Sequence, residues 1–93
     1  MYAHFIHSIN NMKTLDNFTI KQICEGIENV CGKDTLNIVL ASIRDVYNLS
    51  EDTIVDDIAN IILKFDFVDN LYYVLLSDEI YEVEHYLTKS KCE

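Results

Sequence analysis

Residues 50–65, SEDTIVDDIANIILKF, carry the clearest helical period in the chain. Apolar residues recur there at i, i+1, i+4, i+7, i+8 and i+11, which gathers them on one stripe of a helix with about 3.6 residues per turn. The stripe consists of Ile54, Val55, Ile58, Ile61, Ile62 and Phe65. Asp56, Asp57 and Asn60 face the other way. The pattern predicts one helix from Ser50, its N-cap, to about Phe65, with this stripe as the spine of the core.

Length and composition favour a single all-α domain. A chain of 93 residues is long enough for one domain with a modest core. Hydrophobic residues make up 49% of it, so it can bury that core. It has no proline and two glycines, too few for the turns of a β-sandwich or barrel. We therefore expect residues 1–93 to form a compact single-domain bundle of about five short helices.

A well-marked helix is predicted over residues 19–31. Thr19 and Gln22 have the spacing of a capping box, and Gly32 stands where a C-cap glycine belongs. Between them runs an apolar stripe of Ile20, Ile23, Cys24, Ile27, Val30 and Cys31. Gly26 lies in mid-helix, where it lowers helix stability. We expect this glycine to mark a close approach of another helix.

Asp34 provides an N-cap for the next helix, residues 35–47. Its apolar stripe is Leu36, Val39, Leu40, Ile43, Val46 and Tyr47, widened by Ile38. Arg44 is the one cation on this helix, so a helical hairpin is favoured over a DNA-binding helix-turn-helix. Residues 1–12 are predicted to be an accessory helical arm, and residues 88–93 a polar, frayed tail.

Residues 71–87 carry two conflicting patterns. Tyr72, Leu76, Ile80, Val83 and Leu87 lie at i, i+4, i+8, i+11 and i+15, which indicates one long helix or two helices broken at Ser77 and Asp78. Residues 81–87 also alternate like a strand, so a β-hairpin around Ser77–Glu79 is the alternative. No glycine or asparagine is present for the favoured tight turn. We therefore prefer helix.

The net charge of −9 is concentrated in one half of the chain. Residues 1–44 hold four acids and four bases, whereas residues 45–87 hold eleven acids and one base, Lys64. Such an imbalance concerns partners rather than fold. It argues against direct binding of nucleic acid or of an anionic membrane, both of which attract basic proteins.

Targeting signals and cysteines indicate an intracellular environment. No apolar run reaches the length of a membrane span, and the first fifteen residues lack the basic region and apolar core of a signal peptide. We expect a cytoplasmic protein, in the host cytoplasm if the source is a virus. Cys24, Cys31 and Cys92 are therefore expected to be free thiols.

Candidate catalytic and metal sites are weak. The Glu82-x-x-His85 pair has the spacing of carboxylate-bridged di-iron bundles, which need a second copy and two further glutamates. His4 and His7 share one face of any N-terminal helix, but no CxxC or HxxxH completes a ligand set. No Ser/His/Asp order or glycine-rich phosphate loop is present. We expect no cofactor and no enzymatic activity.

Tyrosines and acids coincide in the C-terminal third. Six of the ten aromatic residues fall between residues 65 and 86, and a small core cannot hide them all. Tyrosine with carboxylates is typical of interaction surfaces. The predicted partner-binding residues are Asp56, Asp57, Asp66, Asp69, Tyr73, Asp78, Glu79, Tyr81, Glu82 and Glu84.

This pattern predicts a small acidic module that binds and blocks a basic surface, such as the nucleic-acid channel of a nucleic-acid-processing enzyme. In size, charge and helical character it is similar in kind to nuclease-immunity proteins and virus-encoded inhibitors. Richness in Ile, Asn, Asp and Tyr indicates an AT-rich genome, which suits a phage or virus. The alternative is a homo-oligomeric scaffold that uses the aromatic C-terminal segment as its interface.

Overall fold

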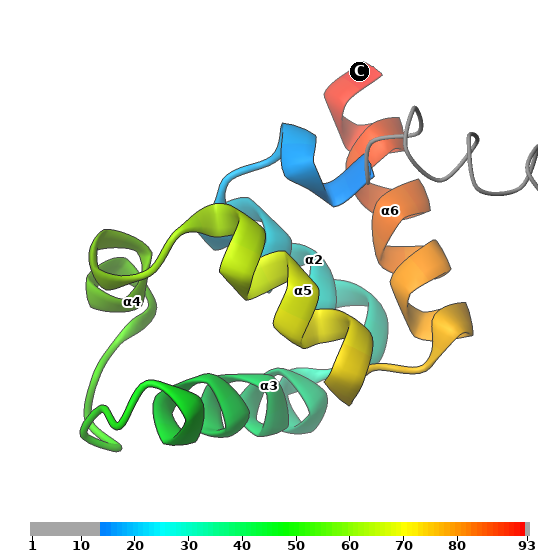
Figure 1. Cartoon of the computed structure of the whole chain (residues 1–93). Helices are drawn as coiled ribbons and strands as arrows, with labels where there is room; N and C mark the ends of the chain where they lie inside the picture. The colour runs from blue at the N-terminus through cyan, green and yellow to red at the C-terminus, as the bar shows by residue number, and fades with distance from the viewer. Residues whose placement is uncertain (1–13, 93) are drawn as a thin grey trace, which may run out of the picture.

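The computed structural model describes residues 14–92, which form five α-helices and one short 3-10 helix and contain no strand (Figure 1). The elements are η1 (Thr14–Asn17), α2 (Ile20–Cys31), α3 (Lys33–Val46), α4 (Val55–Ile61), α5 (Lys64–Val74) and α6 (Ser77–Cys92). The predicted all-α bundle is confirmed. The predicted arm at residues 1–12, with His4 and His7, lies outside the described residues.

Helix α2 is the centre of the bundle. It contacts α3, α4 and α6, while α5 contacts α3, α6 and η1. Figure 1 shows α5 in front of α2, with α4 and α6 on opposite sides of the pair. The fully buried side chains are Leu15, Ile23, Ile27, Val39, Ile43, Ile58, Phe67, Val68, Leu71 and Val83. Every element contributes to one apolar core.

Helix α2 begins and ends where the sequence predicts. The Thr19 hydroxyl accepts a hydrogen bond from the Gln22 amide at 3.0 Å, and the Gln22 side chain accepts one from the Thr19 amide at 2.9 Å. Both halves of the capping box are therefore present. Gly32 has φ of 99°, which a residue with a side chain rarely adopts. Gly32 also serves as the N-cap of α3, so the prediction of Asp34 in that role is wrong.

Gly26 lies against α6, as its mid-helix position predicts. A β-carbon added there would stand 3.2 Å from Leu87 Cγ and Cδ2 and 3.2 Å from Val83 Cγ1. Ordinary carbon–carbon contacts are longer, so the absence of a side chain lets the two helices pack this closely.

Helix α3 ends in a Schellman motif rather than leading directly into the next helix. Asn48 has φ of 58°, and the Leu49 amide donates to the Arg44 carbonyl at 2.7 Å. The Arg44 guanidinium donates two hydrogen bonds, 2.9 and 2.7 Å long, to the Thr53 carbonyl. These bonds hold the connecting segment in a turn. Ser50 therefore accepts a bond from the Asp52 amide at 3.1 Å, and the prediction that it is a helix N-cap is wrong.

The predicted central helix over residues 50–65 is two helices. Helix α4 begins at Val55, its chain becomes extended at Ile62 and Leu63, and α5 begins at Lys64. Ile58 and Ile62 are buried as expected, but Ile54, Ile61 and Phe65 are more than half exposed. The predicted spine is therefore only partly correct. Ile38 and Val46 of α3, also expected in the core, are exposed as well.

The break has a geometric cause. The chain must bury Ile58 and Ile62, and then Phe67, Val68 and Leu71. At about 100° per residue these two sets lie on roughly opposite sides of one continuous helix. An interruption at Ile62 and Leu63 turns the second set back into the core, where α5 contacts α3. Residues 66–70 are helical throughout, because α5 runs through them.

A second break at Leu75 and Leu76 separates α5 from α6. Of the options for residues 71–87, two helices are correct and the β-hairpin does not form. Helix α6 continues to Cys92, well into the segment expected to be a frayed tail. It is the longest helix described, and no helix within residues 14–92 combines the length and apolarity needed to cross a bilayer.

Candidate functional site

The ten predicted partner-binding residues fall on α4, α5 and α6 and not on one face. Asp56 and Asp57 belong to α4, while Asp78, Glu79, Tyr81, Glu82 and Glu84 belong to α6 on the opposite side of the bundle (Figure 1). Asp66, Asp69 and Tyr73 lie on α5 between them. The structure therefore divides the predicted surface into three parts joined through α5.

On α4 the two acids differ in their surroundings. Asp56 forms an ion pair with Lys21 of α2, with 3.8 Å between Oδ1 and Nζ. Both side chains are largely exposed, so the pair contributes at most about 1 kcal/mol to stability. Asp57 is exposed and lies between Ile54 and Ile61 at helical spacing, which gives α4 an outward stripe that mixes apolar groups with a carboxylate.

Helix α5 carries the most prominent exposed stripe. Phe65, Asp69, Tyr72 and Tyr73 are spaced i, i+4, i+7 and i+8 on the helix, and Leu76 follows in the break after it. All five are exposed. Tyr73 is 90% exposed and Leu76 is 69% exposed. The opposite face of the helix packs into the core through Phe67, Val68 and Leu71. Predicted residues Asp69 and Tyr73 therefore share one face of α5 with Phe65, which was not predicted.

Asp66, beside this stripe, joins α5 to the end of α3. The Tyr47 hydroxyl donates a hydrogen bond to the Asp66 carboxylate. Partial burial and the carboxylates of Asp66 and Asp69 raise the pKa of Tyr47, so the tyrosine stays protonated as a donor. This contact fixes the first turn of α5 against α3.

Tyr72 is surrounded by carboxylates from three elements. Burial raises the pKa of Tyr72, as do the nearby carboxylates of Glu84 on α6, Asp16 on η1 and Asp69 on α5. The Tyr72 hydroxyl donates a hydrogen bond to Glu84. Asp16 Oδ1 is buried without a hydrogen-bond partner. Glu84, predicted to bind a partner, therefore takes part in an internal contact between α5 and α6.

Replacing Glu84 with glutamine is expected to stabilise the protein at pH 7. Burial raises the pKa of Glu84 above its ordinary value of 4.5, and the Tyr72 hydrogen bond only partly offsets this. A raised folded-state pKa means that the ionised form lowers stability at neutral pH, and that this loss disappears as pH falls through the folded-state pKa. Because Glu84 is only partly buried and solvent still screens its charge, we expect a gain within about 1 kcal/mol.

Urea unfolding followed by circular dichroism at pH 7 and pH 4 measures this effect. Glu82→Gln removes the same charge from an exposed position of α6 and is the control. The gain from Glu84→Gln should shrink at pH 4. A variant less stable than the natural protein at pH 7 contradicts the assignment.

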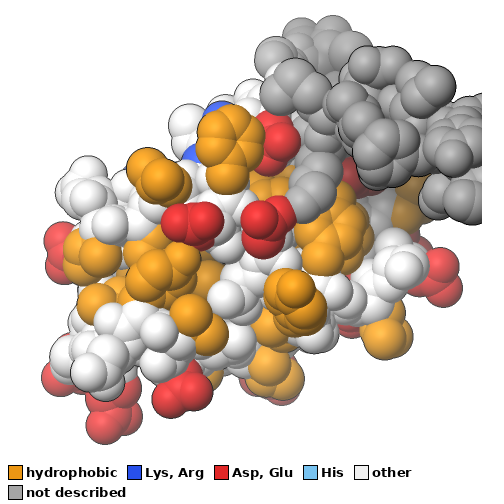
Figure 2. Space-filling view, viewed as in Figure 1, with side chains coloured by type: hydrophobic (Ala, Val, Ile, Leu, Met, Phe, Trp, Pro, Cys, Tyr) orange, Lys and Arg blue, Asp and Glu red, His pale blue; other side chains and the backbone are white. Residues whose placement is uncertain are grey.

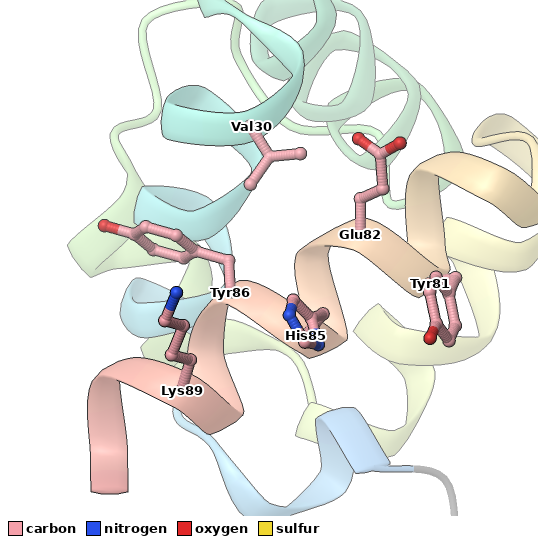
Figure 3. A pocket seen from close by; sticks show the side chains of 6 residues that line it. All are labelled: Val30, Tyr81, Glu82, His85, Tyr86 and Lys89. Carbon is pink, nitrogen blue, oxygen red and sulfur yellow. The ribbon is translucent and has the colours of Figure 1, made fainter. Parts of the chain in front are cut away.

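Helix α6 and the end of α2 form an open pocket of about 360 Å³ (Figure 3). Its lining is Val30 of α2 and Tyr81, Glu82, His85, Tyr86 and Lys89 of α6. The Tyr81 and His85 rings stack at 6.3 Å with 14° between their planes. The pocket thus brings together predicted residues Tyr81 and Glu82. The sequence does contain a signal for the two unpredicted residues His85 and Lys89. Together with Asp78 and Glu82 they recur at i, i+4, i+7 and i+11, the spacing of one exposed helix face.

Glu82 and His85 form the pair that was considered for metal binding. Both side chains line this pocket, but they point in different directions (Figure 3). Within residues 14–92 no group of three or more histidine, cysteine, aspartate or glutamate side chains gathers in a way that could hold a metal ion. Glu79 has a structural contact, since its Oε1 accepts a hydrogen bond from the Leu76 amide at 2.9 Å. With Asp78 it places negative charge in the first turn of α6, where the helix dipole favours it.

Cys24 and Cys31 are free thiols on α2, as expected. Burial, with a smaller contribution from Glu25, raises the pKa of Cys24 to about 12. Burial and the carboxylates of Glu79 and Glu82 raise the pKa of Cys31. Both thiols are therefore held in the protonated form, which is a poor nucleophile and a poor metal ligand.

The exposed side chains of α4, α5 and α6 are the features of the molecule from which a function can be inferred. No protein-family model, curated protein or solved structure matched the chain. What the surface offers is carboxylates interspersed with tyrosine and aliphatic side chains, on three helices that one core holds in place.

Proposed function

We propose that this chain is an acidic protein–protein interaction module that binds, and by occupying it blocks, a basic surface of a partner. The observation that supports this is the composition of the outward faces of α5 and α6, where exposed tyrosines stand among carboxylates. Tyr73 and Tyr81 are 90% and 67% exposed, and Asp66, Asp69 and Glu82 are exposed on the same two helices. We assign the chain no catalytic activity and no cofactor within this proposal.

The two kinds of side chain have complementary effects on binding. Carboxylates attract a basic partner and raise the rate of association, whereas tyrosine buries a large area at a low cost in conformational entropy. A surface that normally binds nucleic acid presents lysine and arginine side chains that match this face. We therefore propose as partner a nucleic-acid-processing enzyme, in the cytoplasm of a host if the chain is viral.

Reversing charge on this surface is expected to weaken partner binding about tenfold or more, because close charge pairs at such interfaces contribute one to several kcal/mol. Asp57→Lys with Glu82→Lys is the test variant, since both side chains are exposed, on α4 and α6 either side of α5, and neither has a hydrogen bond or ion pair with another described residue. Glu28→Lys with Asp34→Lys makes the same charge change on exposed positions of α2 and α3 and is the matched control.

The partner is captured from the native cell with the natural protein, identified, and titrated calorimetrically against all three proteins at about 0.05 and 0.5 M salt. Affinity should fall steeply at high salt because exposed charges are screened. Equal affinity at both salt concentrations would overturn the proposed function.

A second candidate is a homo-oligomeric scaffold that uses the aromatic C-terminal segment. The observation in its favour is the exposure of Tyr73, Leu76 and Tyr81. The net charge of −9 opposes it, because like-charged copies repel one another. Sedimentation equilibrium at micromolar concentration separates the two candidates, since a clean monomer excludes the scaffold.

A further inference from the structure

We infer that the partner segment that docks on this module is an amphipathic, basic α-helix, and that it packs along the outward stripe of α5 with the stripe of α4 beside it. This inference rests on the proposed function and specifies its partner. We call the surface the α4–α5 face, and it consists of Ile54, Asp57, Ile61, Leu63, Phe65, Asp69, Tyr73 and Leu76.

The α5 part of this face has the form of a helix-packing ridge. Phe65 and Tyr73 lie eight residues apart, about 12 Å along the helix at a rise of about 1.5 Å per residue, and Leu76 lies just beyond the end of the helix. Each is more than half exposed, although the opposite side of the same helix is fully buried. Helices pack by fitting such ridges of i±4 side chains into the grooves of a second helix. Helix α5 therefore has one packed side and one side that presents a ridge to solvent.

The α4 part extends the apolar area sideways. Ile54 and Ile61 are 57% and 55% exposed and share one side of α4, and Leu63 follows in the break between α4 and α5. Figure 2 shows hydrophobic side chains gathered where α4, α5 and α3 meet, with carboxylates around them. Exposed apolar patches of several hundred Å² on a monomer commonly mark interaction sites.

Contacts within the bundle hold this face in place. The Arg44 guanidinium binds the Thr53 carbonyl beside Ile54, and the Tyr47 hydroxyl binds Asp66 beside Phe65. Both contacts anchor the segment to the end of α3. A preformed surface loses little conformational entropy on binding, so its apolar groups contribute more of their burial energy to affinity.

The secondary structure of this chain favours a helical partner segment over an extended one. Residues 14–92 contain no strand, so no sheet edge is available there to which a peptide could add a strand. A helix satisfies its own backbone hydrogen bonds and offers side chains at i, i+3, i+4 and i+7 to a ridge of the same period.

Charge decides between a basic partner and a second copy of this chain. Residues 54–76 contain Asp56, Asp57, Asp66 and Asp69 against one base, Lys64. Asp57 and Asp69 lie within the apolar stripes themselves. A second copy would bring the same carboxylates together, whereas lysine or arginine beside the apolar residues of a partner helix would pair with them. A basic helix is therefore the complementary occupant.

The probe is a synthetic peptide of 18 residues in which leucines at i, i+3, i+4 and i+7 alternate with lysines. It is titrated into the full ¹⁵N-labelled chain and followed by amide chemical shifts. A scrambled peptide of the same composition and a glutamate-for-lysine peptide are the controls. We expect shift changes concentrated in residues 54–76 for the amphipathic basic peptide, and at least tenfold weaker binding of both controls.

Two matched protein variants test whether the peptide binds the α4–α5 face or α6. Phe65→Ser with Tyr73→Ser removes the ridge at exposed positions, and Tyr81→Ser with Tyr86→Ser removes as many aromatic rings from α6. Circular dichroism confirms that both variants fold. The first is expected to weaken peptide binding at least tenfold and the second less than twofold.

Shift changes confined to α6, or equal binding of the scrambled peptide, overturn the inference. Absence of peptide binding also overturns it. None of these results touches the proposed function, which fails only if the native partner binds independently of salt. Concentration-dependent broadening of residues 54–76 without peptide means that a second copy occupies the face, and overturns the basic-helix assignment.

Discussion

Phe67→Ala is expected to lower the free energy of unfolding by about 4 kcal/mol, the largest single-residue effect we foresee in this chain. Phe67 is fully buried on α5 and is the largest of the side chains that lose all contact with solvent. Alanine would leave a cavity that a bundle of short helices closes only in part. Since domains of this length have a total stability of roughly 5–14 kcal/mol, much of it would be lost. Urea unfolding monitored by circular dichroism gives the value.

Phe65→Ala is the matched control for this prediction. The two phenylalanines are two residues apart on α5, but Phe65 is 57% exposed. Its removal is expected to change stability by less than about 1 kcal/mol, as is usual at exposed sites. The same variant should weaken binding of the basic helix. If Phe65→Ala destabilises as strongly as Phe67→Ala, the single continuous helix suggested by the apolar period is correct and the break after α4 is wrong.

Gly26→Leu is expected to cost about 3 kcal/mol, because the crossing of α2 and α6 leaves no room for a side chain. The first added carbon already meets Leu87 and Val83 at 3.2 Å. A leucine there must separate the helices or force Leu87 into a strained rotamer. The gain in helix propensity over glycine, about 1 kcal/mol, does not compensate for this strain. The midpoint of thermal unfolding should fall by more than ten degrees.

Two variants define the origin of this loss. Gly26→Ala adds only the β-carbon. The gain in helix propensity and the loss in packing against α6 nearly cancel, so we expect the free energy of unfolding to change by no more than about 1 kcal/mol. Ala41→Leu adds a comparable side chain to an exposed position of α3 and should be neutral. An unchanged stability of Gly26→Leu would show that α2 and α6 do not cross at this glycine.

Local signals in the sequence were sufficient to predict α2 and most of α3. The capping box at Thr19, the glycine at position 32 and the apolar stripes each act within a few residues. Gly26 also predicted a close helix approach, although the sequence does not identify α6 as the neighbour. These features are readable because their physical causes lie close together in the chain.

The break after α4 was not predicted, and the break before α6 was only one of two options, because no glycine, proline or asparagine marks either of them. What marks them is a change in the phase of the apolar residues, as between Ile62 and Phe67. The six-residue stripe over residues 54–65 fitted one helix well enough to conceal this change. Burial of Phe67, Val68 and Leu71 is a tertiary requirement, and it prevailed over local periodicity.

The surface was predictable in composition but not in arrangement. Exposure of tyrosine among carboxylates followed from counting aromatic residues against the capacity of a small core, and Tyr73 and Tyr81 are indeed exposed. Some of the acidic side chains stabilise the fold instead, and which ones do so depends on contacts across the bundle. The hydrogen bond from Tyr72 to Glu84 and the cap that Glu79 provides for α6 arise only once α5 and α6 are placed.

The joints on either side of α5 determine which changes this chain tolerates. Leu63 and Leu76 are each 69% exposed, whereas Ile62 and Leu75 beside them are buried. Ile62, Leu63 and Leu75 have ordinary extended torsions that any amino acid adopts. Substitution of Leu63 or Leu76 removes little core packing, whereas Ile62 and Leu75 must remain apolar because they are buried. Loss or gain of one residue at a joint, by contrast, shifts and turns the whole following helix and takes its buried face out of the core. For folding, the exposed joint positions therefore tolerate changes of residue type, while both joints are intolerant of changes in length.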